Sequence, residues 1–203
     1  MSLVVTVLKN SKQFTPEHVQ WLARQIGDDA PMVCLSDVDI EGVDTIPLAF
    51  NFPGWWSKME ILRPDLDLGD FLFLDLDTVV LGDISRYTDE GDLTVLSCLS
   101  NSPWINSGMM YVTESAKQEP WEYFMDAPDP VMQQNQGGDQ QFLHKFWVDA
   151  ARWQDKYPGE IVSYKRNILK EGFLGNERVV MFHGKPRPWE ANEEWIPKFQ
   201  DQL

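Results

Sequence analysis

The sequence contains few cysteines, and this shortage argues against a disulfide-stabilised protein. Two cysteines occur among its 203 residues, Cys34 and Cys98, and each lies within an apolar run. Two buried free thiols are therefore expected, without a disulfide framework. Free thiols are typical of a reducing compartment, so we expect a cytoplasmic protein.

Positive charge is also scarce. Lysine and arginine number 17 against 32 aspartates and glutamates, which gives a formal net charge of −15 and a pI near 4.4. Nucleic acid is therefore not an expected partner, because a protein that binds the phosphate backbone needs many cationic side chains on one of its faces. An anionic membrane surface is disfavoured for the same reason. No apolar run approaches the ~20 residues of a membrane span, and the short run at 3–8 lacks the basic leader of a signal peptide.

Apolar runs alternate with helical patterns along the chain. The runs at 3–8 and 71–74 are apolar throughout, which is typical of strands buried on both faces of a sheet. A helix is expected over 16–26, because Pro16 suits a first helical turn and Gly27 a helix end. This alternation predicts an α/β fold with a mostly parallel central sheet flanked by helices.

The length predicts one domain over residues 1–203, and no shift in composition marks a boundary. The stretch 126–138 is rich in proline, glutamine and glycine, and is interpreted as a mobile loop. The remaining expected strands cover 32–35, 46–50, 93–99, 108–112 and 178–182, and the remaining expected helices cover 56–62, 120–125 and 139–148.

Two acidic residues, Asp75 and Asp77, follow the apolar run at 71–74. Residues two apart on a strand share a face, and ligands of open parallel sheets bind beyond the carboxyl ends of the strands. Two carboxylates placed there repel each other unless a cation joins them, and Mg²⁺ or Mn²⁺ prefers such oxygen ligands. In the alternative interpretation, one aspartate caps the following turn and the other is solvated.

Lys58 and His183 are further candidates. Lys58 lies in a helical pattern and is either a solvated lysine or a point charge for a phosphate. His183 follows an apolar strand and opens a turn with two further cations, so it is a candidate third metal ligand. His18 and His144 lie within helical patterns and are interpreted as packing or surface residues.

Other polar and aromatic residues allow two interpretations each. Asn106 to Gly108 is either a plain turn or part of a site, and Asp139 caps the helix after it or lines a pocket. The tryptophans near these segments are interpreted mostly as core residues, although one or two beside a pocket would suit a sugar acceptor. They are Trp55, Trp56, Trp104 and Trp189.

Five short segments carry a resemblance to a known family. They are 56–59 (Trp-Ser-Lys-Met), 71–84 (Phe-Leu-Phe-Leu-Asp-Leu-Asp-Thr-Val-Val-Leu-Gly-Asp-Ile), 106–108 (Asn-Ser-Gly), 137–140 (Gly-Gly-Asp-Gln) and 183–189 (His-Gly-Lys-Pro-Arg-Pro-Trp). In this order they resemble the glycogenin-like glycosyltransferases, family 8 and relatives, which have the GT-A fold. The resemblance spans roughly residues 3–190.

The resemblance implies a retaining transfer from a nucleotide-diphosphate sugar, usually a UDP-sugar, to an acceptor that it does not identify: a glycan, a lipid or a protein. It implies Mn²⁺ (or Mg²⁺) held by Asp75, Asp77 and His183. Catalytic contacts to the sugar fall to Asn106, Asp139 and Gln140.

The same resemblance assigns the diphosphate to Lys58 and to either Lys185 or Arg187. The family's commoner spacing between the histidine and the lysine is longer than the step from His183 to Lys185, which leaves that choice open. The remaining donor-binding residues that it implies are Val7, Lys9, Asn10, Leu76, Ser107, Gly138 and Gly184.

Three alternatives remain at this stage. The segment Asp75-Leu76-Asp77-Thr78 also fits the first motif of haloacid-dehalogenase-type phosphatases, in which the first aspartate is a nucleophile, although that motif normally opens its domain. A sugar-nucleotide pyrophosphorylase would need a glycine-rich N-terminal loop, and 7–13 contains no glycine. The third alternative is a non-catalytic module that binds nucleotide sugars.

Overall fold

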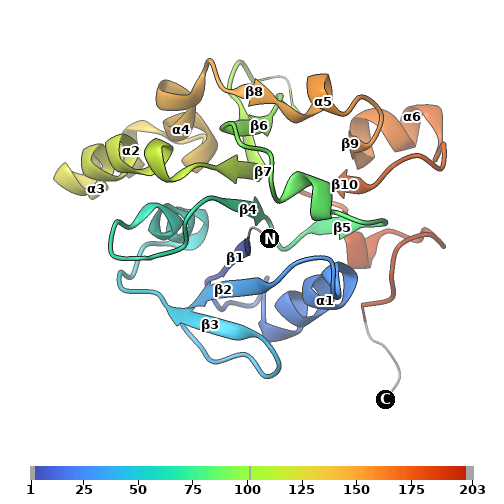
Figure 1. Ribbon diagram of the computed structural model, residues 1–203, viewed down its shortest axis with the longest axis horizontal. Helices are drawn as coiled ribbons and strands as arrows, with labels where there is room; N and C mark the ends of the chain where they lie inside the picture. Colours follow the sequence, from blue (N-terminus) through green and yellow to red (C-terminus); the bar gives the residue numbers. More distant parts are fainter. Residues whose placement is uncertain (1–2, 101, 200–203) are drawn as a thin grey trace.

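The structure is a computed structural model that describes residues 3–100 and 102–199. Across this described part, seven strands form the main sheet in the order β3-β2-β1-β4-β7-β6-β8 (Figure 1). The first four of these strands are mutually parallel, β6 and β8 are parallel, and β7 runs antiparallel to β4 and β6. Their bounds are β1 Leu3–Leu8, β2 Met32–Ser36, β3 Asp44–Pro47, β4 Phe71–Leu74, β6 Thr94–Leu96, β7 Asn106–Val112 and β8 Ala151–Arg152.

A smaller sheet lies beyond the end of β4. It contains β5 (Thr78–Val80), β10 (Val179–Met181) and β9 (Ile161–Ser163), with β10 antiparallel to β5 and parallel to β9. Because β5 follows β4 after only three residues, this sheet brings the late strand β10 next to the acidic pair.

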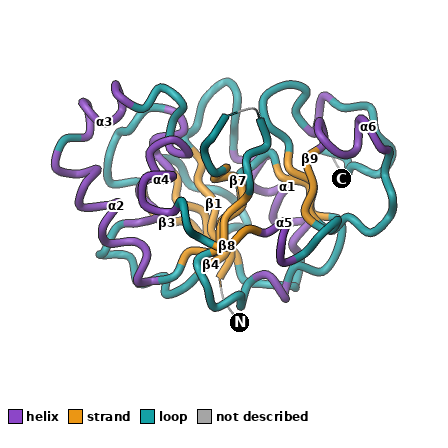
Figure 2. The backbone as a smooth tube through the Cα atoms, turned by 90° about the horizontal axis from the view of Figure 1, so that it is seen from above, coloured by secondary structure: helices purple, strands orange, loops and turns teal. Residues whose placement is uncertain are grey.

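Helices cover both faces of the main sheet, as the continuous apolar strands predict. Figure 2 shows α2, α3 and α4 on one side of the sheet, with α1 and α5 on the other. Side chains alternate accordingly: Val4 and Leu72 pack into the core on the α1 side, whereas Val5 and Phe73 pack into the opposite core. The helix bounds are α1 Pro16–Ile26, α2 Glu114–Asp126, α3 Pro128–Gln134, α4 Asp139–Trp147, α5 Trp153–Lys156 and α6 Leu169–Glu171.

Four further short helices complete the described chain. They are η1 (Gly54–Leu62), η2 (Ser85–Tyr87) and η4 (Pro188–Glu190), which are 3₁₀ helices, and η3 (Tyr164–Ile168), which is a π-helix. None of the helices in the described residues has both the length and the apolar character needed to cross a bilayer.

The expected α/β fold with a mostly parallel sheet is confirmed, but some local predictions are wrong. The stretch 126–138 contains α3, which Pro128 begins and whose Val131 is buried in the core. The expected strand at 46–50 ends at Pro47. Only Cys34 of the two free thiols is buried, because Cys98 lies in the partly exposed segment after β6.

Candidate active site

The candidate site lies at the carboxyl end of β4. The backbone N–H of Asp75 donates to the carbonyl of Gly108 at 2.8 Å, and the N–H of Thr78 donates to the carbonyl of Asp75 at 3.1 Å. The first bond extends the antiparallel pairing of β4 with β7, and the second closes a turn. The Asn-Ser-Gly segment at the start of β7 is therefore beside the acidic pair, although about thirty residues separate the two segments in the sequence.

Lys58 connects four elements at this point. Its Nζ lies 2.9 Å from Asp75 Oδ1 and 3.0 Å from Asp139 Oδ2, and it donates to Ser107 Oγ at 3.2 Å. These partners follow β4, begin α4 and belong to β7. Lys58 is only 7% exposed, so the interpretation as a solvated surface lysine is wrong. Burial disfavours its ammonium, but Asp139 and Asp75 outweigh this effect and hold the pKa of Lys58 above its usual value.

Asp139 faces this lysine instead of capping its own helix. The N-cap of α4 is Gly138, which adopts a φ of 80°, and no side chain caps the helix. The Asp139 carboxylate instead accepts from Ser107 Oγ at 2.5 Å and pairs with Lys58. The Asp139 side chain therefore does not cap α4, and its role in a ligand site stays a prediction.

Two amides lie next to these charged groups. Asn106 Nδ2 donates to Gln140 Oε1 at 3.2 Å, and Asn106 Oδ1 accepts from the N–H of Gly108 at 3.0 Å. The Asn-Ser-Gly and Gly-Asp-Gln segments are thus joined by two side-chain hydrogen bonds, Asn106 to Gln140 and Ser107 to Asp139. A side chain at Gly108 would crowd this junction, because its Cβ would lie 2.9 Å from Met181 Cε and 3.3 Å from Asp75 Oδ2.

Asp77 forms the second acidic position. Its carboxylate is 6% exposed and pairs with the Arg187 guanidinium, which also lies over the Phe14 ring at 5.1 Å. Burial and the neighbouring charge of Asp75 raise the pKa of Asp77 to about 6, although Arg187 opposes them. Partial burial likewise raises the pKa of Asp75, against the opposing charge of Lys58. The two carboxylates therefore repel each other in the protein.

His183 follows the end of β10. The antiparallel pairing of β10 with β5 ends at Met181 opposite Thr78, so His183 lies two residues beyond this pair and Asp77 directly precedes it. The His183 Nε2 atom lies 3.0 Å from Ser163 Oγ. Burial, Lys165 and Arg166 lower the pKa of His183, which favours the neutral imidazole that a metal requires.

Within residues 3–100 and 102–199, no three histidine, cysteine, aspartate or glutamate side chains form a ready metal-binding group. The cations Lys58 and Arg187 pair with the two aspartates instead. The metal-ligand assignment of Asp75, Asp77 and His183 stays a prediction.

The two candidate phosphate cations after His183 differ in position. The Lys185 side chain is 84% exposed and pairs with Glu190 at 3.1 Å, away from the acidic pair. Arg187 instead reaches Asp77. Gly184, which separates His183 from these two cations, has a left-handed φ of 69°, and this conformation turns the chain after His183.

Lys9 and Asn10, which follow β1 and are predicted to bind the nucleotide, contact two residues that the sequence analysis did not identify, Asp37 and Asn51. Lys9 Nζ lies 2.9 Å from Asp37 Oδ2 and donates to Asn51 Oδ1 at 2.9 Å, and the Asn10 N–H donates to Asp37 Oδ1 at 2.8 Å. Asp37 could have been identified from the sequence, because it directly follows β2 and so lies at the same edge of the sheet as Asp75. Val7 lies in β1 next to this group and is half-buried.

Leu76 differs from the other predicted donor-binding residues because its side chain packs into the core on the α1 side. Only its backbone is therefore left to face a ligand.

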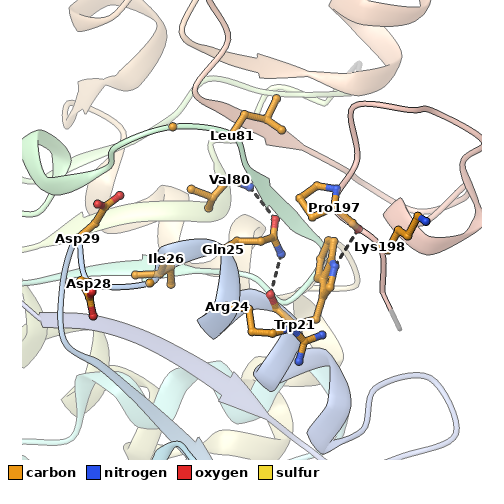
Figure 3. A pocket seen from close by; sticks show the side chains of 12 residues that line it. Trp21, Arg24, Gln25, Ile26, Asp28, Asp29, Val80, Leu81, Pro197 and Lys198 are labelled. Atoms are coloured by element: carbon orange, nitrogen blue, oxygen red, sulfur yellow. Dashed lines mark hydrogen bonds between the residues drawn. The ribbon is translucent and has the colours of Figure 1, made fainter. Parts of the chain in front are cut away.

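A separate surface cleft of about 610 Å³ lies between α1, β5 and the segment at Pro197 (Figure 3). Trp21 Nε1 donates to the Pro197 carbonyl at 3.0 Å, which joins the Pro197 segment to α1. Gln25 Oε1 accepts from the Val80 N–H at 3.0 Å, which joins β5 to α1. None of the site residues predicted above lines this cleft.

Comparisons with known proteins agree with the fold. No protein-family model matches the sequence, and no curated protein matches it significantly. The solved glycosyltransferase GlyE of Streptococcus pneumoniae superimposes with a TM-score of 0.66 at 16% identity, over 93% of this chain and 56% of GlyE. The chain therefore spans a little over half the length of GlyE.

Two other solved structures are similar. The galactosyltransferase LgtC, solved with donor and acceptor sugar analogues, matches with a TM-score of 0.62 at 11% identity, over 94% of this chain and 90% of LgtC. The bifunctional glycosyltransferase WbbM matches with a TM-score of 0.59 at 10% identity, over 93% of this chain and 46% of WbbM. At these identities the likeness shows the fold, which is the GT-A type expected from the sequence. Membership of family 8 stays a prediction.

Proposed function

We propose that this protein is a metal-dependent glycosyltransferase that uses a nucleotide-diphosphate sugar, with a UDP-sugar as donor. One observation carries the proposal. The Lys58 ammonium joins Asp75, Asp139 and Ser107 at the carboxyl end of a central strand, in a fold shared with solved glycosyltransferases. This fold places ligands at that edge of the sheet. A cytoplasmic location remains part of the proposal.

The residues at this edge fit a divalent cation. Burial and the neighbouring charge of Asp75 raise the pKa of Asp77, and a bound cation would relieve the repulsion between the two carboxylates. Asp75, Asp77 and a neutral His183 are the residues that would hold it, and two oxygens with one nitrogen suit Mn²⁺ or Mg²⁺. When bound, the metal would neutralise charge on the diphosphate leaving group.

Chain residues supply the other requirements of the transfer. The bond between the sugar C1 and the diphosphate oxygen breaks, its electron pair leaves with the nucleoside diphosphate, and an acceptor hydroxyl bonds to C1. The hydroxyl proton passes to the departing phosphate. Lys58 and Arg187 would stabilise negative charge on that phosphate, while Asn106 and Gln140 would orient the sugar hydroxyls.

Retention of configuration is the stereochemical outcome that we propose, and the groups around the site support it. An inverting transfer needs a carboxylate free to accept the hydroxyl proton. The side chains nearest to the proposed sugar position are the amides of Asn106 and Gln140, and Asp139 is engaged by Lys58 and Ser107. Asp139 is accordingly proposed as a residue that holds the site together and contacts the sugar.

The test uses a charge-matched pair of variants. The Asp75→Asn, Asp77→Asn double variant should bind Mn²⁺ and UDP at least about 100-fold more weakly than the parent in calorimetric titrations, because the carboxylates are lost. The control is Asp39→Asn, Asp67→Asn, which changes the same charge at two exposed positions. Equal binding by the parent and the site variant would contradict the site assignment.

A second measurement separates an enzyme from a binding module. The parent is incubated with UDP-glucose, UDP-galactose and their N-acetylamino counterparts in the presence of Mn²⁺, and UDP release is followed. An enzyme releases UDP slowly by hydrolysis even without an acceptor, and the site variant should release none. Tight UDP binding without any release, with and without a panel of sugar acceptors, would instead identify a non-catalytic module.

A further inference from the structure

An exposed tryptophan stands next to the proposed active site. Trp55 lies in η1, three residues before Lys58, and is 59% exposed. Its neighbour Trp56 is buried and stacks on Phe124 at a ring-centroid distance of 5.6 Å, as a core residue does. Trp55 is therefore one of the exceptions that the sequence interpretation allowed. Its exposed indole calls for an explanation, because burying an indole is favourable.

The indole of Trp55 lies against the backbone of Gly138, two residues before Gln140, whose amide we propose to contact the sugar. A Cβ at Gly138 would lie 2.7 Å from Trp55 Nε1 and 3.0 Å from its Cδ1, so only glycine lets the ring lie this close. On the preceding residue, the Trp104 ring occupies the space beside Gly137 in the same way. Two indoles thus flank the turn that leads directly into Asp139 and Gln140.

The chemistry around Trp55 suits a carbohydrate. A pyranose has an apolar C–H face that packs on an aromatic ring and a rim of hydroxyls that needs amide partners. Gln140 follows this turn and accepts a hydrogen bond from the amide of Asn106 at the start of β7, and Gln141 Oε1 accepts from the Gly137 N–H at 2.8 Å. An acyl chain has no groups that could form hydrogen bonds with these polar side chains, which makes a lipid tail a poorer fit.

We propose that Trp55 is the stacking platform for the sugar ring of the acceptor, so that the acceptor substrate ends in a carbohydrate. This inference rests on the proposed function. Trp55 and Lys58 lie one helical turn apart on η1, and Lys58 is the residue that we propose to contact the diphosphate. A ring on Trp55 would therefore lie beside the donor sugar, where an attacking hydroxyl has to be.

The test is saturation-transfer NMR with methyl β-D-galactoside, methyl β-D-glucoside, lactose and maltose as probes, each with and without UDP and Mn²⁺. At millimolar sugar, the parent should transfer saturation to the axial C–H protons of at least one probe. Trp55→Ala should weaken this binding about tenfold, and Trp55→Tyr should largely retain it because an aromatic face remains. Tyr123→Ala is the control, since Tyr123 is an aromatic residue of similar exposure (53%) on α2.

Three results would overturn the inference. They are the absence of saturation transfer from every probe, equal binding by the parent and Trp55→Ala, and a loss of UDP-sugar affinity in Trp55→Ala, which would assign Trp55 to the donor. Binding of UDP with Mn²⁺ to the parent is measured in the same samples. Its absence contradicts the proposed function, whereas its presence without a Trp55 effect contradicts only the acceptor platform.

Discussion

The candidate site consists of two halves that differ in how completely they are assembled. In the first half, Lys58, Asp75, Asp139 and Ser107 bond directly to one another, and the elements that carry them pack in the core. In the second half, Arg187 pairs with Asp77, His183 contacts Ser163, and Lys185 points into solvent. The first half is therefore preformed, and the proposed metal would add a partner to Asp75 alone. In the second half, Arg187 and Ser163 would have to release Asp77 and His183 before the proposed metal could bind.

The largest effect is expected at Lys58. Lys58→Ala would leave Asp139 and Asp75 without their cation, and removing one partner of a buried ion pair costs about 3 kcal/mol of the free energy of unfolding. Urea denaturation followed by tryptophan fluorescence measures this change. Lys185→Ala is the matched control and should change stability by less than about 0.5 kcal/mol, since its side chain is 84% exposed. Equal effects of the two variants would break the distinction between the halves.

Arg187 tests the exchange of partners more directly. Arg187→Ala frees Asp77, so the affinity for Mn²⁺ alone should rise about threefold or more. The affinity for UDP at saturating Mn²⁺ should fall about tenfold, because a charged hydrogen bond to phosphate is lost. Calorimetric titration gives both values.

The same titration of Lys185→Ala decides between the two cations that the sequence left open. Arg187 reaches the acidic pair and Lys185 does not, so Lys185→Ala should bind UDP within about twofold of the parent. If Lys185→Ala loses UDP binding and Arg187→Ala keeps it, the diphosphate belongs to Lys185.

The smallest effect is expected at Ser163. Ser163→Ala removes the hydrogen-bond partner of His183 Nε2 at a cost of about 1 kcal/mol in stability. The freed imidazole should then raise Mn²⁺ affinity by no more than about threefold. A tenfold fall in Mn²⁺ affinity would mean that Ser163 orients His183 for the metal, and the second half would then be as preformed as the first.

Much of this arrangement was predictable from the sequence, for a physical reason. Continuous apolar runs such as 71–74 are read as buried strands, and the acidic pair at the end of that run fixed the edge at which to look for a site. The contacts of Lys58 with both Asp75 and Asp139 were not predictable, because they depend on how η1 packs between β4 and α4.

Other features were missed where local pattern is weak. The helix α3 has only seven residues, and its first three include two prolines, so its composition resembled a loop. The strands β8 and β9 contain two and three residues, too few for a period to appear. The position of the Trp55 ring depends on Gly138, which lies more than eighty residues away in the sequence.

The central claim is that donor binding requires a metal held by Asp75 and Asp77, and one measurement tests it most directly. UDP is titrated into the parent protein with Mn²⁺ and then with a chelator in its place. In an acidic chain with net charge −15, Lys58 and Arg187 are largely neutralised by carboxylates, so the account predicts at least about 100-fold weaker UDP binding in chelator. Equal affinity in the two titrations would contradict the claim.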